Sequence, residues 1–226
     1  MRKILIAALF TSLTACLDTS GANSITLDFD FNVAGENWVP AASDFDVGQE
    51  ATVDLVGELR PLESPLNTAV SGLYLAGTNY NDDLFTYFKK YLCCLAPGAS
   101  FTATVEMQIA SPVHAGCTAL GPNVWVKAGA STDEPASVDV GGVYGFTLDK
   151  GDQAAAGDYT QLGDIRNTLT GCPSPGTWDT KVTLRRSQSV SFTTAADGGF
   201  WFYMGVESGD PGRHELYFTA MRLVLD

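Results

Sequence analysis

Most apolar residues of the chain alternate with polar residues in short segments that end at Gly, Pro, Asn or Asp. The clearest segments are 25–33 and 101–109, where every second side chain is apolar. A period of two places alternate side chains on opposite faces of a β-strand. Further strands are predicted at 51–59, 70–76, 122–128, 138–148, 181–193, 199–206 and 214–225. About ten strands spaced in this way predict an all-β fold, an antiparallel two-sheet jelly-roll sandwich.

Residues 83–95 fit two kinds of element. Their apolar side chains have the spacing of one helix face, with Asn81 or Asp82 as a candidate N-cap. The local pattern alone slightly favours this helix. Aromatic residues are nevertheless common in strands, and every neighbouring segment is predicted to be a strand. We therefore expect a strand here.

Residues 149–180 carry the weakest pattern and are rich in Gly, Asp, Ala and Thr. They are predicted to form one long loop excursion between strands. Long loops on rigid sandwiches often bind ligands, but a passive loop is at least as well supported. Because the chain contains no internal repeat or long linker, residues 24–226 are expected to form a single domain.

The N-terminus has the pattern of an export signal. Positive residues precede an apolar stretch, Ile4 to Leu13, which is too short to span a bilayer. The sequence Leu13-Thr14-Ala15-Cys16 resembles the bacterial lipoprotein box, in which the cysteine is lipidated and the chain is cut before it. The resemblance implies a signal peptide at 1–15, a lipidated Cys16 with a polar tether to residue 23, and a membrane as partner. The alternative is an ordinary secretory signal with a chance cysteine.

A lipidated export signal predicts the location of the protein. We expect an exported protein that is anchored by lipid in the bacterial cell envelope, at the outer membrane or cell surface rather than in the cytoplasm. The chain has 13 Lys and Arg against 26 Asp and Glu, and its net charge of -13 repels phosphate backbones and anionic headgroups. This charge argues against nucleic acid as a partner.

Four cysteines follow Cys16, and export permits disulfides. Adjacent cysteines rarely bridge each other, because the peptide between them must distort. The preferred pairing is therefore Cys117 with Cys172, while Cys93 and Cys94 remain thiols or pair elsewhere. A zinc site is the rival interpretation, but no second Cys-x-x-Cys or nearby His pair supports it.

Common enzyme signatures are missing from the sequence. It contains no Gly-x-Ser-x-Gly elbow, His-Glu-x-x-His, P-loop or dinucleotide fingerprint. The two histidines, His114 and His214, are expected to be solvated. No catalytic residue and no required cofactor is predicted, although an acid pair of the kind used in glycoside hydrolysis remains open.

Two acids suggest a metal site. The series Asp28-x-Asp30-x-Asn32 begins like a calcium loop, but Val33 and Val39 replace the glycine and glutamate that such a loop needs. On a strand, Asp28 and Asp30 would either contribute two ligands to a structural calcium ion or simply face water.

Aromatic and polar residues near strand ends are candidates for binding a sugar, because sugar C–H faces pack on exposed rings. Trp201 and Tyr203 share one strand face opposite an apolar set, so one set lies outside the core unless a loop covers it. The candidate ligand-binding residues are Trp38, Tyr80, Asn81, Asp82, Trp125, Trp201, Tyr203 and Glu207.

Three segments carry a resemblance to a known family. Residues 29–38, 95–101 and 215–223 resemble the jelly-roll fold of galactose-binding-like and carbohydrate-binding modules. Residues 72–85 and 127–131 are similar to uncharacterised exported bacterial proteins. The family resemblance implies a strand at 83–92, a glycan partner, and a structural calcium ion held by acids near the first strand. The final strand of those modules usually carries an Asp, where this chain has Thr219.

Together these observations predict a lipid-anchored, exported β-sandwich that binds a carbohydrate or small ligand without catalysis. Two alternatives remain, a structural or protein-interaction lipoprotein of the envelope and an acid-pair glycoside hydrolase.

Overall fold

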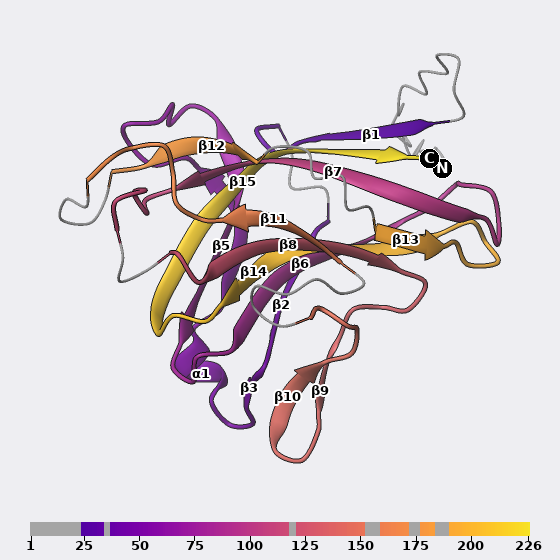
Figure 1. Ribbon diagram of the computed structural model, residues 1–226, viewed down its shortest axis with the longest axis horizontal. Coiled ribbons are helices and arrows are strands. Elements are labelled where there is room, and N and C mark those ends of the chain that lie inside the picture. Colours follow the sequence, from indigo (N-terminus) through magenta and orange to yellow (C-terminus); the bar gives the residue numbers. More distant parts are fainter. Residues whose placement is uncertain (1–23, 34–36, 118–120, 152–158, 172–176, 184–189) are drawn as a thin grey trace, which may run out of the picture.

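The computed structural model describes residues 24–33, 37–117, 121–151, 159–171, 177–183 and 190–226. These residues form a sandwich of antiparallel β-sheets, which confirms the predicted fold class (Figure 1). Within the described ranges, no helix has the length and apolar character needed to cross a bilayer. The predicted signal peptide, Cys16 and the tether lie outside the described residues.

One sheet has seven strands and is built around the last strand of the chain. Its order is β12 (Asp179–Thr183), β7 (Ser100–Ser111), β15 (Gly212–Leu225), β5 (Ser71–Asn79) and β4 (Val56–Pro61). In addition, β1 (Ile25–Asp30) pairs with β15, and β13 (Val190–Thr193) pairs with β7. The 14 residues of β15 therefore have three partner strands.

The second sheet has five strands, in the order β11 (Thr160–Asp164), β8 (Val124–Ser131), β14 (Phe200–Ser208), β6 (Leu84–Leu92) and β2 (Val39–Ser43). Alternation on β14 sends Phe200, Phe202, Met204 and Val206 into the space between the sheets, where they are fully buried. This space contains the main core, and burial of its apolar area is the dominant stabilising contribution.

A small third sheet covers part of the outer face of the five-stranded sheet. It consists of β3 (Phe45–Asp46), β10 (Val143–Phe146) and β9 (Ser137–Asp139), and the β9–β10 hairpin extends from the body of the molecule (Figure 1). The Phe146 ring packs against Phe85, Tyr87 and Tyr203, with centroid distances of 5.1, 5.0 and 5.2 Å. The outer face is therefore apolar where the hairpin lies.

Several predicted elements differ from the structure in detail. Segment 83–92 is a strand, β6, as expected. Segment 51–59 instead divides into the short helix α1 (Glu50–Val53) and β4, because Asp54 adopts a left-handed conformation that ends the helix. The excursion 149–180 contains β11 and the start of β12, so it contributes an edge strand to each large sheet. Strands β2 and β3 were not predicted, since Pro40 and two alanines hide the alternation of β2.

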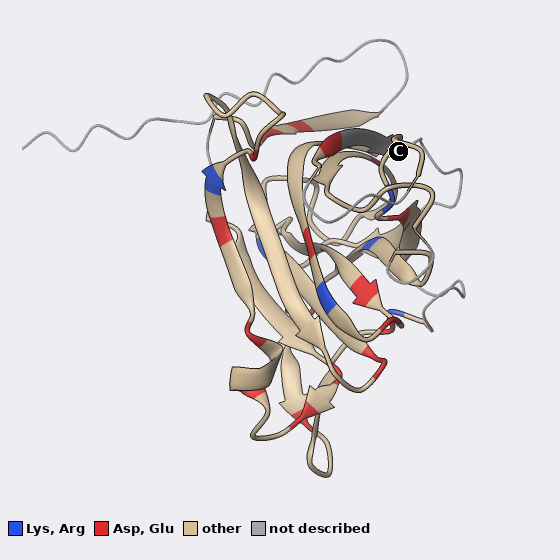
Figure 2. Ribbon diagram, turned by 90° about the vertical axis from the view of Figure 1, so that its left-hand side faces the viewer, with Lys and Arg blue, Asp and Glu red and all other residues tan. Residues whose placement is uncertain are grey.

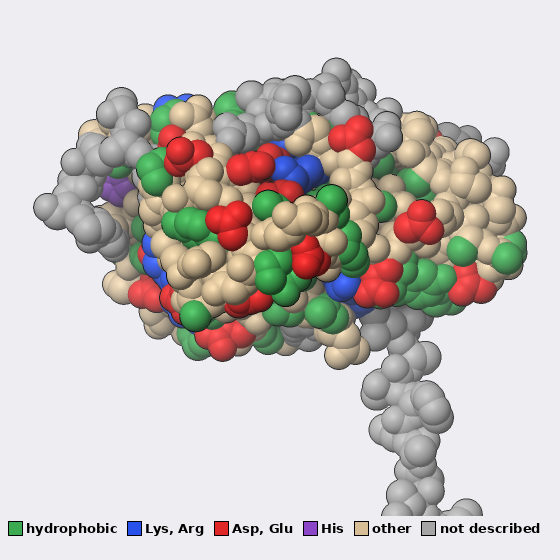
Figure 3. Space-filling model, turned by 90° about the horizontal axis from the view of Figure 1, so that it is seen from below, with side chains coloured by type: hydrophobic (Ala, Val, Ile, Leu, Met, Phe, Trp, Pro, Cys, Tyr) green, Lys and Arg blue, Asp and Glu red, His purple; other side chains and the backbone are tan. Residues whose placement is uncertain are grey.

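Acidic side chains lie on strands as well as in turns (Figure 2). They are also spread over the face that carries the hairpin tip, as Figure 3 shows. The surface seen in these views is therefore unsuited to a polyanionic partner.

Candidate functional site

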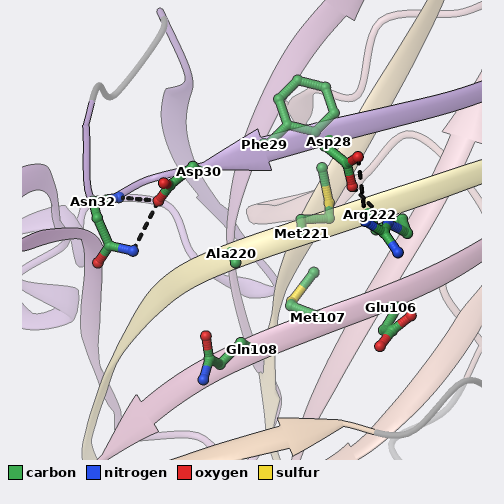
Figure 4. A pocket seen from close by; sticks show the side chains of 10 residues that line it. All are labelled: Asp28, Phe29, Asp30, Asn32, Glu106, Met107, Gln108, Ala220, Met221 and Arg222. Carbon is green, nitrogen blue, oxygen red and sulfur yellow. Dashed lines mark hydrogen bonds and ion pairs between the residues drawn. The ribbon is translucent and has the colours of Figure 1, made fainter. Parts of the chain in front are cut away.

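A groove with a volume of about 550 Å³ crosses the outer face of the seven-stranded sheet. It extends over β1, β15 and β7, which lie side by side in Figure 4. Because all of its lining residues except Asn32 lie on paired strands, its shape is held mainly by the sheet itself.

Strand register arranges the polar side chains of the groove in two rows. The first row places Asp28 of β1 opposite Arg222 of β15, and Arg222 opposite Glu106 of β7. The second row places Asp30 opposite Ala220, and Ala220 opposite Gln108. Residues directly opposite on paired strands have Cβ atoms about 4.5–5.5 Å apart, so each row forms a continuous line across three strands.

The hollow of the groove follows from the small residue at its centre. Ala220 has only a methyl group between the longer side chains of Asp30 and Gln108 (Figure 4). Any larger side chain at this position of β15 would occupy the space between those two polar groups.

Hydrogen bonds hold the polar groups of the groove in place. The Arg222 Nε donates to Asp28 Oδ1 at 2.6 Å, and Nη2 donates to Oδ2 at 3.3 Å. The Asp28 carboxylate raises the pKa of the Arg222 guanidinium above its ordinary value. At the other end, the backbone N–H and the side-chain amide of Asn32 donate to Asp30 Oδ1 at 3.0 and 2.8 Å.

The longer side chains that project from the groove into solvent carry hydrogen-bonding groups. Phe29, Met107 and Met221 also line it, but they are 9, 1 and 2% exposed and belong to the core. The remaining side chains are mostly planar groups that can donate or accept hydrogen bonds at two atoms. Three carboxylates against one guanidinium make the groove acidic, so it favours a neutral, hydroxyl-rich ligand over an anion.

The two acids expected at a calcium site both line this groove. Asp28 is bound by Arg222, whose positive charge opposes a cation at the same carboxylate. Among the described residues, no three His, Cys, Asp or Glu side chains converge in a way that could hold a metal ion.

A second surface of interest is an aromatic pair on the outer face of the five-stranded sheet. Tyr91 of β6 and Trp201 of β14 are cross-strand neighbours with ring centroids 5.3 Å apart. Tyr91 is 38% exposed, and its hydroxyl donates to the Asp197 carboxylate, whose oxygens lie at 2.8 and 2.7 Å. The Lys89 ammonium lies 5.7 Å from the Trp201 ring centroid. This pair offers partly exposed rings, whereas the Phe29 ring at the groove is buried.

Other candidate residues are buried. Trp38 lies in the main core, where it makes edge contacts with the rings of Phe29, Phe31 and Phe202. Tyr203 is 1% exposed beneath the β9–β10 hairpin.

Glu207 is likewise 1% exposed, and it is enclosed by two lysines. It forms ion pairs with the buried Lys127 and with Lys150, in the latter case at 2.7 Å. Its carboxylate is therefore engaged within the protein.

The remaining candidates are separated from Trp201. Tyr80, Asn81 and Asp82 precede β6, whereas Trp201 lies beside the end of that strand. The Tyr80 hydroxyl accepts a hydrogen bond from the Asp46 backbone N–H at 2.8 Å, and the Asn81 amide donates to Asp44 O at 3.2 Å. Trp125 is half-buried on β8 next to β11. The eight candidates therefore do not form one site.

Both histidines are buried rather than solvated as expected. His214 is fully enclosed, with its Nε2 2.9 Å from the Thr86 hydroxyl, and burial lowers its pKa to about 4. His114 is 5% exposed and contacts Thr177 O through Nε2 at 3.1 Å. Neither residue lines the groove.

The cysteines are only partly described. Cys172 lies outside the described residues, so its pairing with Cys117 stays a prediction. Gly116, next to Cys117, lies against the backbone of Gly171, since a Cβ added to Gly116 would be 2.8 Å from it. Cys93 and Cys94 are exposed thiols whose Sγ atoms are 2.7 Å apart.

Sequence reasoning missed Glu106, Gln108, Ala220 and Arg222 as members of a site. The available signal was alternation, which places Glu106 and Gln108 on the polar face of their strand, as it does Asp28 and Asp30. The missing information was register, because Asp28 and Arg222 are 194 residues apart in sequence.

No family model matches the chain, and no curated protein matches it. Solved structures do. They include the carbohydrate-binding module TmCBM61 in complex with β-1,4-galactotriose, at 10% identity over 83% of this chain and 88% of that chain, with a TM-score of 0.35.

Two other matches are similarly distant. The K1 cleaved adhesin domain of Lys-gingipain from Porphyromonas gingivalis matches at 12% identity over 88% of this chain and 96% of that chain, with a TM-score of 0.34. A structure from a study of promiscuous carbohydrate-binding modules of the β-sandwich superfamily matches at 11% identity over 84% and 58%, with a TM-score of 0.36. Similarity this low carries no argument about the ligand.

Proposed function

We propose that the protein is a non-catalytic binding module for a neutral glycan, which it holds in the groove over β1, β15 and β7. The observation that carries the proposal is the pair of polar rows across three adjacent strands with Ala220 at the centre of the hollow. Planar carboxylate, amide and guanidinium groups at fixed spacing suit the adjacent hydroxyl groups of a sugar ring.

Size and charge support the same ligand class. A volume of about 550 Å³ falls within the range of about 300–1,000 Å³ that is common for small-molecule sites. The excess of carboxylates over guanidinium favours neutral sugars over uronic or sialic acids. Because the Phe29 ring at the groove belongs to the core, the groove would bind a glycan through hydrogen bonds. These hydrogen bonds compete with water and give modest affinity.

The proposal can be tested on an array of neutral glycans with four forms of residues 17–226. The first is the unchanged sequence, the second carries Ala220→Trp, the third carries Val224→Trp as a matched control, and the fourth carries Trp201→Ala in the aromatic pair. Ala220 and Val224 share the outer face of β15, but only Ala220 lines the groove. We expect Ala220→Trp to reduce binding at least tenfold, because the indole fills the hollow, while Val224→Trp retains binding.

Four outcomes would contradict this proposal. Equal binding by both tryptophan variants would remove the groove as the site, and loss of binding only in Trp201→Ala would move the site to the aromatic pair. Absence of binding to any glycan would favour a structural or protein-interaction role. Release of reducing sugar ends during incubation would instead indicate an acid-pair hydrolase.

A metal is not required by this proposal. If Asp28 and Asp30 contact the glycan directly, the binding measured in calcium should persist when a chelator is added. Loss of binding in chelator would instead indicate a structural calcium ion at these two acids.

The proposed location is the bacterial envelope, with a lipid on Cys16 as anchor. This part rests on the sequence Leu13-Thr14-Ala15-Cys16. Cells that express the protein and are fed an alkyne-labelled fatty acid should incorporate label into the unchanged chain and not into Cys16→Ser. Equal labelling of both forms would exclude lipidation at this residue, and release of the unlabelled protein into the medium would favour an ordinary secretory signal.

A further inference from the structure

Two adjacent thiols stand at the end of β6, outside the groove. Cys93 and Cys94 directly follow Leu92, both are exposed, and their Sγ atoms are 2.7 Å apart. This separation is shorter than ordinary contact between sulfur atoms and exceeds a disulfide bond of about 2.05 Å by only a fraction of an ångström. The side chains are therefore already oriented toward each other.

The conformation of Cys94 and contacts on both sides of the pair hold this arrangement. Cys94 has a φ of +79°, a left-handed conformation that is uncommon for a residue with a Cβ atom. On one side, the hydroxyl of Tyr91 is bonded to Asp197. On the other, the N–H of Leu95 donates to Gly198 O at 3.1 Å. Contacts with the 197–198 turn thus fix both ends of the segment that contains the pair.

The geometry points to a redox modification site, at which Cys93 and Cys94 form a reversible disulfide with each other by exchange with a low-molecular-weight disulfide. In the first step, one thiolate attacks the small disulfide, forms a mixed disulfide and releases one small thiol. In the second step, the neighbouring thiolate attacks the protein sulfur of the mixed disulfide and releases the second small thiol. One protein S–S bond forms, and the small disulfide is reduced to two thiols.

This disulfide would be labile rather than structural. Adjacent Cα atoms are about 3.8 Å apart across a trans peptide, whereas most disulfides join Cα atoms about 4.4–6.8 Å apart. The resulting strain makes a bond easier to reduce, and exposed, strained disulfides are typically the reversible ones. The hydrogen bond with Cys94 raises the pKa of the Cys93 thiol, so exchange through Cys93 should accelerate as pH increases.

A bound metal fits the pair less well. Within the described ranges, Cys93 and Cys94 belong to no group of three or more metal-ligating side chains. The redox site is also independent of the proposed glycan groove, which lies on the other sheet.

The test uses the full chain with Cys16→Ser, so that the lipidation site contributes no thiol. The reduced protein is incubated with oxidised glutathione, and remaining thiols are blocked with an alkylating reagent. Mass spectrometry then examines a proteolytic peptide whose only cysteines are Cys93 and Cys94. The single variants Cys93→Ser and Cys94→Ser are treated in the same way, and circular dichroism confirms that each variant is folded.

We expect the unchanged peptide to lose two hydrogen atoms and to retain no glutathione, because the neighbouring thiol displaces it. Each single variant should retain one glutathione, since it lacks the second thiol. Reduced glutathione should restore both thiols of the unchanged pair. The inference is overturned if the unchanged peptide retains glutathione as long as the single variants do, or if both of its thiols remain available for alkylation.

Discussion

His214 illustrates how a single buried side chain makes stability depend on pH. Burial lowers its pKa to about 4, against an ordinary value of 6.5. Between these values the unfolded chain binds a proton that the folded protein does not bind. The free energy of unfolding should therefore decrease as the pH falls from 6.5 toward 4, by on the order of 3 kcal/mol from this residue.

Urea unfolding at pH 7 and pH 4.5 checks this prediction when the protein is compared with His214→Gln. The amide can still hydrogen-bond to the Thr86 hydroxyl but does not titrate. Carboxylates contribute to both proteins alike, so the difference between the two pH dependences isolates His214. An equal loss of stability in both proteins would show that the imidazole becomes protonated in the folded state.

At the level of elements, an ion cluster attaches the segment after the β9–β10 hairpin to the five-stranded sheet. Lys150 follows β10 and contacts Glu207 of β14 at 2.7 Å and Asp44 at 3.2 Å. Burial alone would lower the pKa of Lys150, but Glu207 and Asp44 raise it above its ordinary value. Lys127 of β8 completes the cluster and is fully buried.

Glu207→Gln should destabilise the protein by about 3–5 kcal/mol, because it removes the buried carboxylate that forms an ion pair with the fully buried Lys127 ammonium. The matched control is Glu134→Gln, which removes a largely exposed partner of Lys89 and should cost no more than about 1 kcal/mol. Denaturant unfolding of both variants at neutral pH measures the two costs. Similar values for the two variants would show that the buried cluster contributes no more than a surface ion pair.

The hairpin also explains why some strands were hard to recognise from sequence. Strand β6 carries apolar side chains on both faces, since Phe85 and Tyr87 lie under the hairpin while Phe88 faces the main core. Alternation was therefore lost, and the local pattern alone slightly favoured a helix. The same cover buries Tyr203, which local pattern alone could not distinguish from the partly exposed Trp201.

For the molecule as a whole, the sequence predicted the sandwich and the outward direction of Asp28, Asp30, Glu106 and Gln108. These inferences need only local periodicity. The groove itself depends on which strand lies between β1 and β7 and on the register that places Ala220 between Asp30 and Gln108. Such long-range pairing leaves no local signal in the sequence, and so the binding surface was assigned to aromatic residues elsewhere.

The position of β15 also constrains the order of events during synthesis. It pairs with β1, β5 and β7, although it is the last strand of the domain to be made. Strand β1 has no other partner among the described strands. Ile25 can therefore pair only after its partner Leu225 has been synthesised. The seven-stranded sheet therefore cannot close until almost the entire domain has been synthesised.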